Sequence, residues 1–318
     1  MKAEAVKDQG ESKTERGRQG PALVSSLILH PSSLILGVLW LLHFLPLGML
    51  ASVGRAVGTL LYFVAPGRRR VADTNLRLCF PSWSNAQRSR VARAHFQALA
   101  RSFIERGLAW WAPQERLQRL IRIEGGEHWQ AVARRPVIWL APHFVGLDMG
   151  GVRLSMEGEA VSVYSRQKNP VIDAILYHGR TRFVMPELIS RQEGMRAVLR
   201  ALRRGLPFYY LPDMDFGERD SIFVPFFGVP AATITGLARL ARLADAAVVP
   251  ALTRQLPGAQ GYELRFYPAW GGFPSGDLVA DTRRMNEFIE QRVLEMPEQY
   301  YWVHRRFKTR PPGEPKIY

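Results

Sequence analysis

The chain has 318 residues, of which 43 are Lys or Arg and 28 are Asp or Glu, so its formal net charge is +15. Hydrophobic residues make up 47%, enough apolar side chain to offset the conformational entropy lost on folding, which excludes a disordered protein. The 27 glycines and single cysteine exclude collagen-like and disulfide-stapled chains and fit a reducing compartment. The positive charge suits nucleic acid, an anionic membrane, an acidic protein or an anionic substrate.

The N-terminal part of the sequence predicts a membrane anchor. Residues 1–20 are polar and are expected to form a disordered tail without a secretory signal. Residues 21–66 form the expected anchor region, because its richest part, Leu34 to Val53, has the 20 or so apolar residues that can span a bilayer. Pro46 would kink such a helix, and a buried hairpin of core helices is the alternative. Residues 67–318 are expected to form the catalytic domain.

The rest of the chain alternates between helix and strand patterns. Residues 84–110 predict an amphipathic helix with Ser84 as its N-cap. The strands expected after it are 136–141, 160–164, 208–211, 247–252 and 262–267, and the helices are 192–204, 235–243 and 281–296, the last capped by Asp281. This alternation predicts an α/β fold with a mixed, largely parallel sheet flanked by helices, whose functional residues lie at the carboxyl ends of strands.

The strongest candidate site follows the strand at 136–141. His143 and Asp148 lie in the turn after Pro142, and Gly146 between them leaves space for a close approach. On one helix the two side chains would point about 140° apart, so they can meet only if His143 lies in the turn before the helix. His143 would then be a general base, and Asp148 would hold the imidazole tautomer. A structural histidine is the alternative.

Five separated motifs in the chain resemble the late acyltransferases of lipid A biosynthesis, within the lysophospholipid acyltransferase superfamily. The motifs, in chain order, are Asn75 to Pro81, His143-x4-Asp148, Pro212-Asp213-Met214-Asp215, Phe223 to Gly228, and Pro297 to Pro311. The resemblance runs from about His30 to the C-terminus. It implies a glycerolipid-acyltransferase-like fold with an N-terminal membrane-anchoring helix.

The resemblance also implies an activity. An acyl group would pass from acyl carrier protein to a hydroxyl of a Kdo-bearing lipid A precursor, with His143 as base and Asp148 as its partner. Arg180 and Asp213 match functional positions of the family and are candidates for substrate binding. Asp215 belongs to the same acidic motif, and Arg166 is a further candidate although it lies one position away from the family's usual arginine. The enzyme would sit on the bacterial inner membrane with its catalytic domain in the cytoplasm.

Alternatives remain open at this stage. A glycerolipid acyltransferase of the same fold is the nearest, although the first and last motifs argue against it. A non-catalytic membrane or polyanion binder would not need His143, and a hydrolase acting on the same lipids would use water in place of the acceptor. No cofactor is expected beyond the acyl carrier protein as co-substrate, no nucleic acid partner, and no zinc site, since CxxC and HExxH are absent. Cys79 is expected to be buried.

Overall fold

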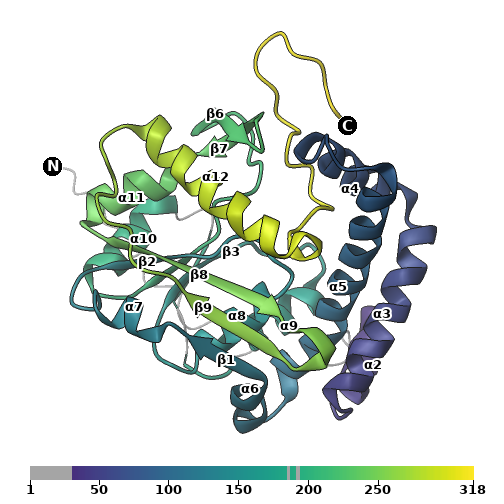
Figure 1. Ribbon diagram of the computed structural model, residues 1–318. Coiled ribbons are helices and arrows are strands. Elements are labelled where there is room, and N and C mark those ends of the chain that lie inside the picture. The colour runs from purple at the N-terminus through teal and green to yellow at the C-terminus, as the bar shows by residue number, and fades with distance from the viewer. Residues whose placement is uncertain (1–30, 185–186, 191–193) are drawn as a thin grey trace, which may run out of the picture.

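A computed structural model of the protein describes residues 31–184, 187–190 and 194–318. The expected tail at 1–20 and the first part of the anchor region therefore lie outside the described residues. The described chain forms three layers, with a sheet between two sets of helices, and a helical hairpin against one side (Figure 1). The predicted α/β class and the mixed, largely parallel sheet are confirmed.

The main sheet has seven strands in the order β1-β9-β8-β2-β5-β3-β4. Its strands from β8 to β4 are mutually parallel, while β9 runs antiparallel to β8 and parallel to β1. A separate antiparallel hairpin is formed by β6 and β7. The strands are β1 Ile121–Glu124, β2 Val137–Leu140, β3 Val161–Tyr164, β4 Glu187–Ser190, β5 Phe208–Tyr210, β6 Ser221–Phe226, β7 Val229–Ile234, β8 Ala247–Gln255 and β9 Tyr262–Phe266.

Helices cover both faces of this sheet. The helices are α2 Pro31–Leu42, α3 Leu47–Val64, α4 Pro66–Cys79, α5 Asn85–Trp111, α6 Gln114–Leu120, α7 Gly126–Gln130, α8 Leu147–Leu154, α9 Pro170–Thr181, α10 Gly194–Arg203, α11 Gly236–Ala244 and α12 Leu278–Glu295, with short 3₁₀ turns η2 Pro257–Ala259 and η3 Pro297–Gln299. One apolar core joins α10, α11 and α12 to the sheet, and a second joins α8 to its opposite face. The long helix α5 contributes to both cores, which places it across one end of the sheet.

Strand β2 shows why the sheet is central. Its side chains alternate between the two cores: Ile138 belongs to the core beneath α10, α11 and α12, and Trp139 to the core beneath α8. All four of its residues are buried, as expected for a strand covered by helices on both faces. The chain leaves this buried strand at Pro142, and the candidate His143 follows at once.

The apolar N-terminal segment is not one continuous helix. The chain turns between α2 and α3, where Pro46 has no N–H to donate and becomes the N-cap of α3. Arg116, from α6, donates hydrogen bonds to the carbonyls of His43 (2.6 Å) and Leu45 (2.5 Å), which satisfies the backbone at the turn. The expected span over 34–53 is therefore wrong in its bounds. Within the described residues, the helix long and apolar enough to cross a membrane is α3, Leu47–Val64.

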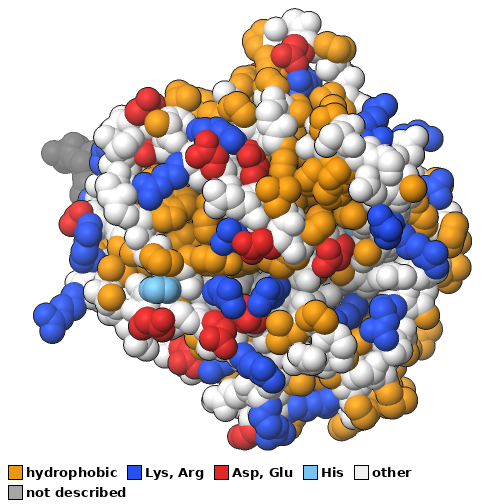
Figure 2. Space-filling view, viewed as in Figure 1, with side chains coloured by type: hydrophobic (Ala, Val, Ile, Leu, Met, Phe, Trp, Pro, Cys, Tyr) orange, Lys and Arg blue, Asp and Glu red, His pale blue; other side chains and the backbone are white. Residues whose placement is uncertain are grey.

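The hairpin of α2 and α3 packs along α5 and leaves an apolar face outward. A Cβ built on Gly54 would lie 2.5 Å from the Cα of Arg101, and one on Gly58 would lie 2.4 Å from the Cα of Gln97. Glycine at both positions therefore lets the two helices approach closely. On the outer face, Leu34 is 75% exposed, and Figure 2 shows hydrophobic side chains gathered along this edge of the molecule.

Most predicted elements after residue 80 are confirmed, with two corrections. Ser84 caps α5 in a capping box with Gln87. Helix α12 begins earlier than expected, because its N-cap is Asp277, whose side chain accepts hydrogen bonds from the amides of Val279 and Ala280. Asp281 instead accepts hydrogen bonds from the Ser275 amide. The helix expected at 192–204 is α10, whose predicted start lies outside the described residues.

Candidate active site

The imidazole of His143 is held by Asp213, from the loop that follows the neighbouring strand β5. Strands β2 and β5 pair in parallel, so the loops that follow them meet at one edge of the sheet. Asp213 Oδ1 lies 2.6 Å from His143 Nδ1, and Asp213 Oδ2 accepts a hydrogen bond of 2.9 Å from the His143 amide. Because a carboxylate accepts at Nδ1, the proton is on Nδ1 and the basic lone pair is on Nε2.

Asp213 is placed to remain ionised. Burial, at 1% exposure, by itself raises the pKa of this carboxyl. The charge of His143, the two hydrogen bonds from that residue and the charge of Arg306 oppose burial and hold the pKa of Asp213 below its ordinary value. An ionised carboxylate on Nδ1 stabilises the imidazolium that forms when Nε2 takes up a proton.

The expected pairing of Asp148 with His143 is not what the structure shows. Asp148 lies in the first turn of α8 and accepts a 2.6 Å hydrogen bond from Nε of Arg106, on α5. Burial raises the pKa of Asp148, but the charge and hydrogen bond of Arg106 and the charges of Arg180 and His143 outweigh burial and lower this pKa overall. The first turn of α8 directs the Asp148 side chain toward α5, and the carboxylate that is hydrogen-bonded to His143 Nδ1 is that of Asp213.

Arg180 lies near Asp148, as a residue of a binding site would. It is near the end of α9, and its guanidinium carbon lies 5.6 Å from the centre of the Tyr164 ring. Its charge lowers the pKa of Asp148. In the described part of the chain, no carboxylate lies within ion-pair distance of Arg180. This cation is therefore available to an anionic group.

Two other candidate residues lie elsewhere. The side chain of Arg166 is 87% exposed, and its Nε lies 3.9 Å from Asp173 Oδ2. Asp215 is buried and accepts hydrogen bonds from the amide (2.7 Å) and hydroxyl (2.8 Å) of Thr309 and from the Gly217 amide. The geometry makes Asp215 an anchor for the C-terminal segment, so the expectation that it contacts substrate is not supported by its position.

The C-terminal segment holds the loop that carries His143. The Val145 amide donates to the Gln299 carbonyl (2.9 Å), and the Tyr301 amide donates to the His143 carbonyl (3.1 Å). Asn75, from α4, in turn donates to the carbonyls of Trp302 and His304, both at 2.7 Å. The first and last sequence motifs therefore meet in space, where together they fix the position of the base.

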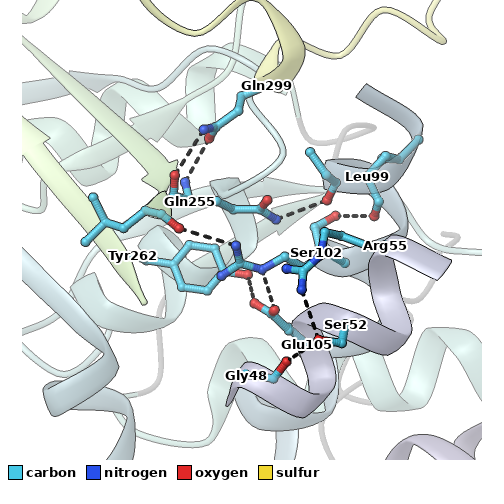
Figure 3. A network of polar contacts seen from close by, with 12 residues as sticks. Gly48, Ser52, Arg55, Leu99, Ser102, Glu105, Gln255, Tyr262 and Gln299 are labelled. Carbon is cyan, nitrogen blue, oxygen red and sulfur yellow. Dashed lines mark hydrogen bonds and ion pairs between the residues drawn. The ribbon is translucent and has the colours of Figure 1, made fainter. Parts of the chain in front are cut away.

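Gln299 also ties this loop to the rest of the domain. Figure 3 shows its side chain facing Gln255 at the end of β8: the amide of Gln255 donates to the Gln299 side chain (2.8 Å), which donates back to the Gln255 carbonyl (3.0 Å). Nearby, Glu105 accepts hydrogen bonds from Arg101 (2.5 Å) and from the hydroxyl of Tyr262. These buried contacts link α5, the sheet and the loop, so they rigidify the site.

An apolar cavity begins where the His143 loop enters α8. It has a volume of about 120 Å³, and Leu147 and Asp148 are part of its wall. Most of its wall is apolar, and the polar end carries Asp148 and Arg180. The apolar wall includes Trp110, Trp139, Val152, Leu154, Leu176 and Leu211. A slot of this kind suits a hydrocarbon chain whose polar end remains near Asp148.

Gly179 lets the Trp110 side chain lie against it in the cavity wall without a steric clash. A Cβ built on Gly179 would lie 2.2 Å from Trp110 Cδ1, and one on Gly151 would lie 3.7 Å from the Tyr209 ring. Gly179 immediately precedes Arg180, so the same short segment shapes the wall and supplies the cation. Cys79 is buried as expected, and burial raises the pKa of its thiol. Among the described residues, no three His, Cys, Asp or Glu side chains gather as a metal site would require.

Sequence reasoning missed Arg106 and Gln299. Arg106 is one of many arginines on α5, and nothing in the spacing marks it as the partner of Asp148. Gln299 is inside a motif that was singled out, but its side chain acts on Gln255, 44 residues away. Such long-range partners follow from the strand order of the sheet, and the strand order could not be read from local patterns.

Comparison with known proteins identifies close resemblances over almost the whole described chain. The family model described as bacterial lipid A biosynthesis acyltransferase matches residues 22–309. A lipid A biosynthesis lauroyltransferase of Escherichia coli is 35% identical over 92% of this chain and 98% of its own length. A palmitoleoyltransferase of the same organism is 32% identical over 89% of this chain and 92% of its own length. A myristoyltransferase of that organism is 31% identical over 85% of this chain and 83% of its own length.

Among solved structures, the 1-acyl-sn-glycerophosphate acyltransferase of Thermotoga maritima covers 78% of this chain and 96% of its own chain, with a TM-score of 0.37 and 14% identity. The three Escherichia coli relatives are named for different acyl chains, although all share the same pathway name.

Proposed function

The chain belongs to the bacterial lipid A biosynthesis acyltransferase family, and from this we propose that it transfers a fatty acyl chain from acyl carrier protein to a hydroxyl of a Kdo-bearing lipid A precursor. That it is an acyltransferase of lipid A biosynthesis follows from the family itself. The finer proposal is carried by one observation: His143 is hydrogen-bonded to Asp213, and the loop that carries His143 leads into the helix that lines an apolar cavity.

His143 is the general base in this proposal. Nε2 takes the proton of the acceptor hydroxyl as its oxygen attacks the carbonyl carbon of the acyl thioester. The tetrahedral intermediate then collapses, the carbon–sulfur bond breaks, and the thiolate of the carrier receives the proton from the imidazolium. No acyl-enzyme is needed, because the acceptor oxygen attacks the thioester directly. Asp213 orients the ring and stabilises its charged form through Nδ1.

The two arginines have separate roles in this scheme. Arg106 is neutralised by its hydrogen-bonded ion pair with Asp148. Arg180 keeps an available charge at the polar end of the cavity, where the thioester oxygen becomes negative and where the phosphates of the acceptor approach. Asp148 thus acts as a positioning residue, which holds Arg106 and lies in the field of Arg180.

The acyl chain of the donor occupies the apolar cavity. Val152 and Leu154 on α8 and Leu176 on α9 would replace water around the chain, and each buried methylene contributes about 0.8 kcal/mol. Gly151 lies on the same wall, where any side chain would project among the lining residues. A Gly151→Leu variant is therefore expected to favour shorter acyl chains. An unchanged chain-length profile would remove this wall from the proposal.

The remaining parts of the proposal concern location. The apolar hairpin of α2 and α3 would hold the enzyme on the bacterial inner membrane, with the catalytic domain on the cytoplasmic side, where acyl carrier protein is found. The support is the exposed apolar face of the hairpin, together with the family's place in lipid A biosynthesis.

Mass spectrometry of lipid A from cells with and without the gene tests the proposal. We expect the deletion to remove one secondary acyl chain, the wild-type gene to restore it, and the His143→Ala gene to fail. The mass of the lost chain identifies the donor. The four strains are the parent, the deletion, and the deletion carrying either the wild-type or the His143→Ala gene. Lipid A of identical mass in all four, in a background deleted for related acyltransferases, would overturn the proposal.

A further inference from the structure

We propose that a groove between α3 and α5 binds the phosphate headgroup of an anionic membrane phospholipid. The groove has a volume of about 420 Å³. Tyr62 and Phe63, near the end of α3, form one wall, and Arg90, Arg93 and Gln97 of α5 form the other. It shares no lining residue with the cavity at Asp148. None of these residues has a part in the proposed acyl transfer.

The charge of the groove suits a phosphate. Arg90 and Arg93 are three residues apart on α5, so both guanidinium groups lie on one side of the helix. Both side chains are exposed, and among the described residues no carboxylate lies within ion-pair distance of either. The guanidinium carbon of Arg93 lies 5.9 Å from the centre of the Phe63 ring, which leaves its N–H groups directed to other acceptors.

The groove continues the apolar face of the hairpin. At the same end of α3, Leu60 and Phe63 are each 59% exposed and Val64 is 61% exposed. Side chains of this kind, when they enter the hydrocarbon layer, place the adjoining cations at the level of the lipid phosphates. Figure 2 shows Lys and Arg side chains beside the upper part of this apolar edge. Because the groove continues this apolar face, the phosphate that it binds is expected to belong to a membrane lipid.

The position of the groove argues against the phosphates of the acceptor. Arg93 and Arg106 lie on the same helix, 13 residues apart, so they are separated by about 20 Å along its axis. Arg106 marks the polar end of the acyl cavity through its ion pair with Asp148. Arg180 lines the acyl cavity and is available to the phosphates of the acceptor, and the groove, which shares no lining residue with that cavity, is left to a second lipid.

The test uses the purified full-length protein, and vesicles of phosphatidylcholine with or without phosphatidylglycerol. The variant is Arg90→Gln with Arg93→Gln. The control removes the same charge through Arg196→Gln with Arg200→Gln on α10, which lies at the opposite end of the molecule from α3 (Figure 1). All four side chains are exposed, so both variants are expected to fold, and circular dichroism checks that they do.

We expect the phosphatidylglycerol-dependent gain in vesicle binding to fall about thirtyfold in the groove variant, as for two basic residues removed from the membrane surface, and to change less than threefold in the control. Equal losses in the two variants would overturn the proposal, because they would reflect net charge alone. A raised KM for the acceptor in phospholipid-free detergent would also overturn it, because the groove would then serve the acceptor.

Discussion

The loop at His143 and the hairpin of α2 and α3 both pack near α5, but they are held in different ways. The loop is fixed by hydrogen bonds from residues distant in sequence: Asp213, Gln299 and Tyr301 each bind it. The hairpin is held by close helix packing at Gly54 and Gly58, and its outer face is apolar and exposed. The proposed chemistry thus depends on directional contacts that fix one geometry, whereas the proposed membrane anchor depends on a surface that many sequences could supply.

The largest expected effect lies in the loop and separates its two carboxylates. We expect Asp213→Asn to lower kcat by about 10³ to 10⁴, since the imidazole loses its anionic partner. Asp148→Asn is expected to lower kcat by about tenfold to a hundredfold, as for the loss of one charged hydrogen bond outside the reacting pair. Exposed Asp245→Asn serves as the control. A larger loss of kcat in Asp148→Asn than in Asp213→Asn would restore Asp148 as the partner of His143.

The next largest effect is expected at Asn75, whose hydrogen bonds hold the C-terminal segment that packs against the His143 loop. Asn75→Ala removes, from a fully buried position, the two hydrogen bonds to the carbonyls of Trp302 and His304. We expect the free energy of unfolding to fall by about 2 to 4 kcal/mol, with a loss of kcat, because the C-terminal segment also holds His143. Chemical denaturation measures the first effect. Asn85→Ala, at an exposed position, is the control, and a similar small change in both would contradict the role of Asn75.

A buried histidine gives the domain a pH dependence of its own. Nδ1–H of His95 donates a hydrogen bond to the Glu298 carbonyl (3.0 Å), and burial lowers the pKa of His95 from 6.5 to about 4. Between these values the unfolded chain binds a proton that the folded chain does not, so stability is complete above pH 6.5 and is lost as the pH falls toward 4. The expected loss is of the order of 3 kcal/mol.

The matched measurement compares unfolding of wild type, His95→Gln and the partly exposed-site variant His128→Gln between pH 7 and 4, with the pH values chosen to bracket these pKa values. His95→Gln should flatten the dependence, and His128→Gln should leave it unchanged. Parallel curves for all three proteins would show that His95 does not carry this dependence.

The smallest effect on folding is expected on the outer face of the hairpin. Leu41 is 62% exposed, so Leu41→Ser should change the free energy of unfolding by less than about 0.5 kcal/mol while it weakens vesicle binding. Leu50→Ala, at a fully buried position, should instead cost about 2 to 5 kcal/mol. If Leu41→Ser destabilised the fold as much as Leu50→Ala, the outer face would be packed against protein.

The same contrast explains what could be predicted from the sequence. Ser84, the strand before Pro142 and the apolar character of the hairpin follow from local patterns, and all are confirmed. The turn at Pro46 was expected as a kink, with a hairpin of helices as the alternative, because its stabilising partner Arg116 lies about 70 residues away.

The site was predicted only in part, for a related reason. His143 was singled out correctly as a residue at the end of a strand, but its hydrogen-bond partner depends on which strand lies beside β2. That strand is β5, which carries Asp213 to Nδ1. Asp148 is five residues from His143 and its carboxylate is bound by Arg106 instead. Sequence proximity therefore misled the assignment where sheet order decides it.

Acyl transfer by the purified protein tests the central claim most directly. Wild type and His143→Ala, each shown to be folded and to bind vesicles, are compared in a single turnover from acylated acyl carrier protein to the lipid A precursor. We predict that His143→Ala transfers the acyl chain at least about 10³ times more slowly, while the His128→Ala control retains the wild-type rate. Transfer by His143→Ala at the wild-type rate would contradict the claim that His143 is the base.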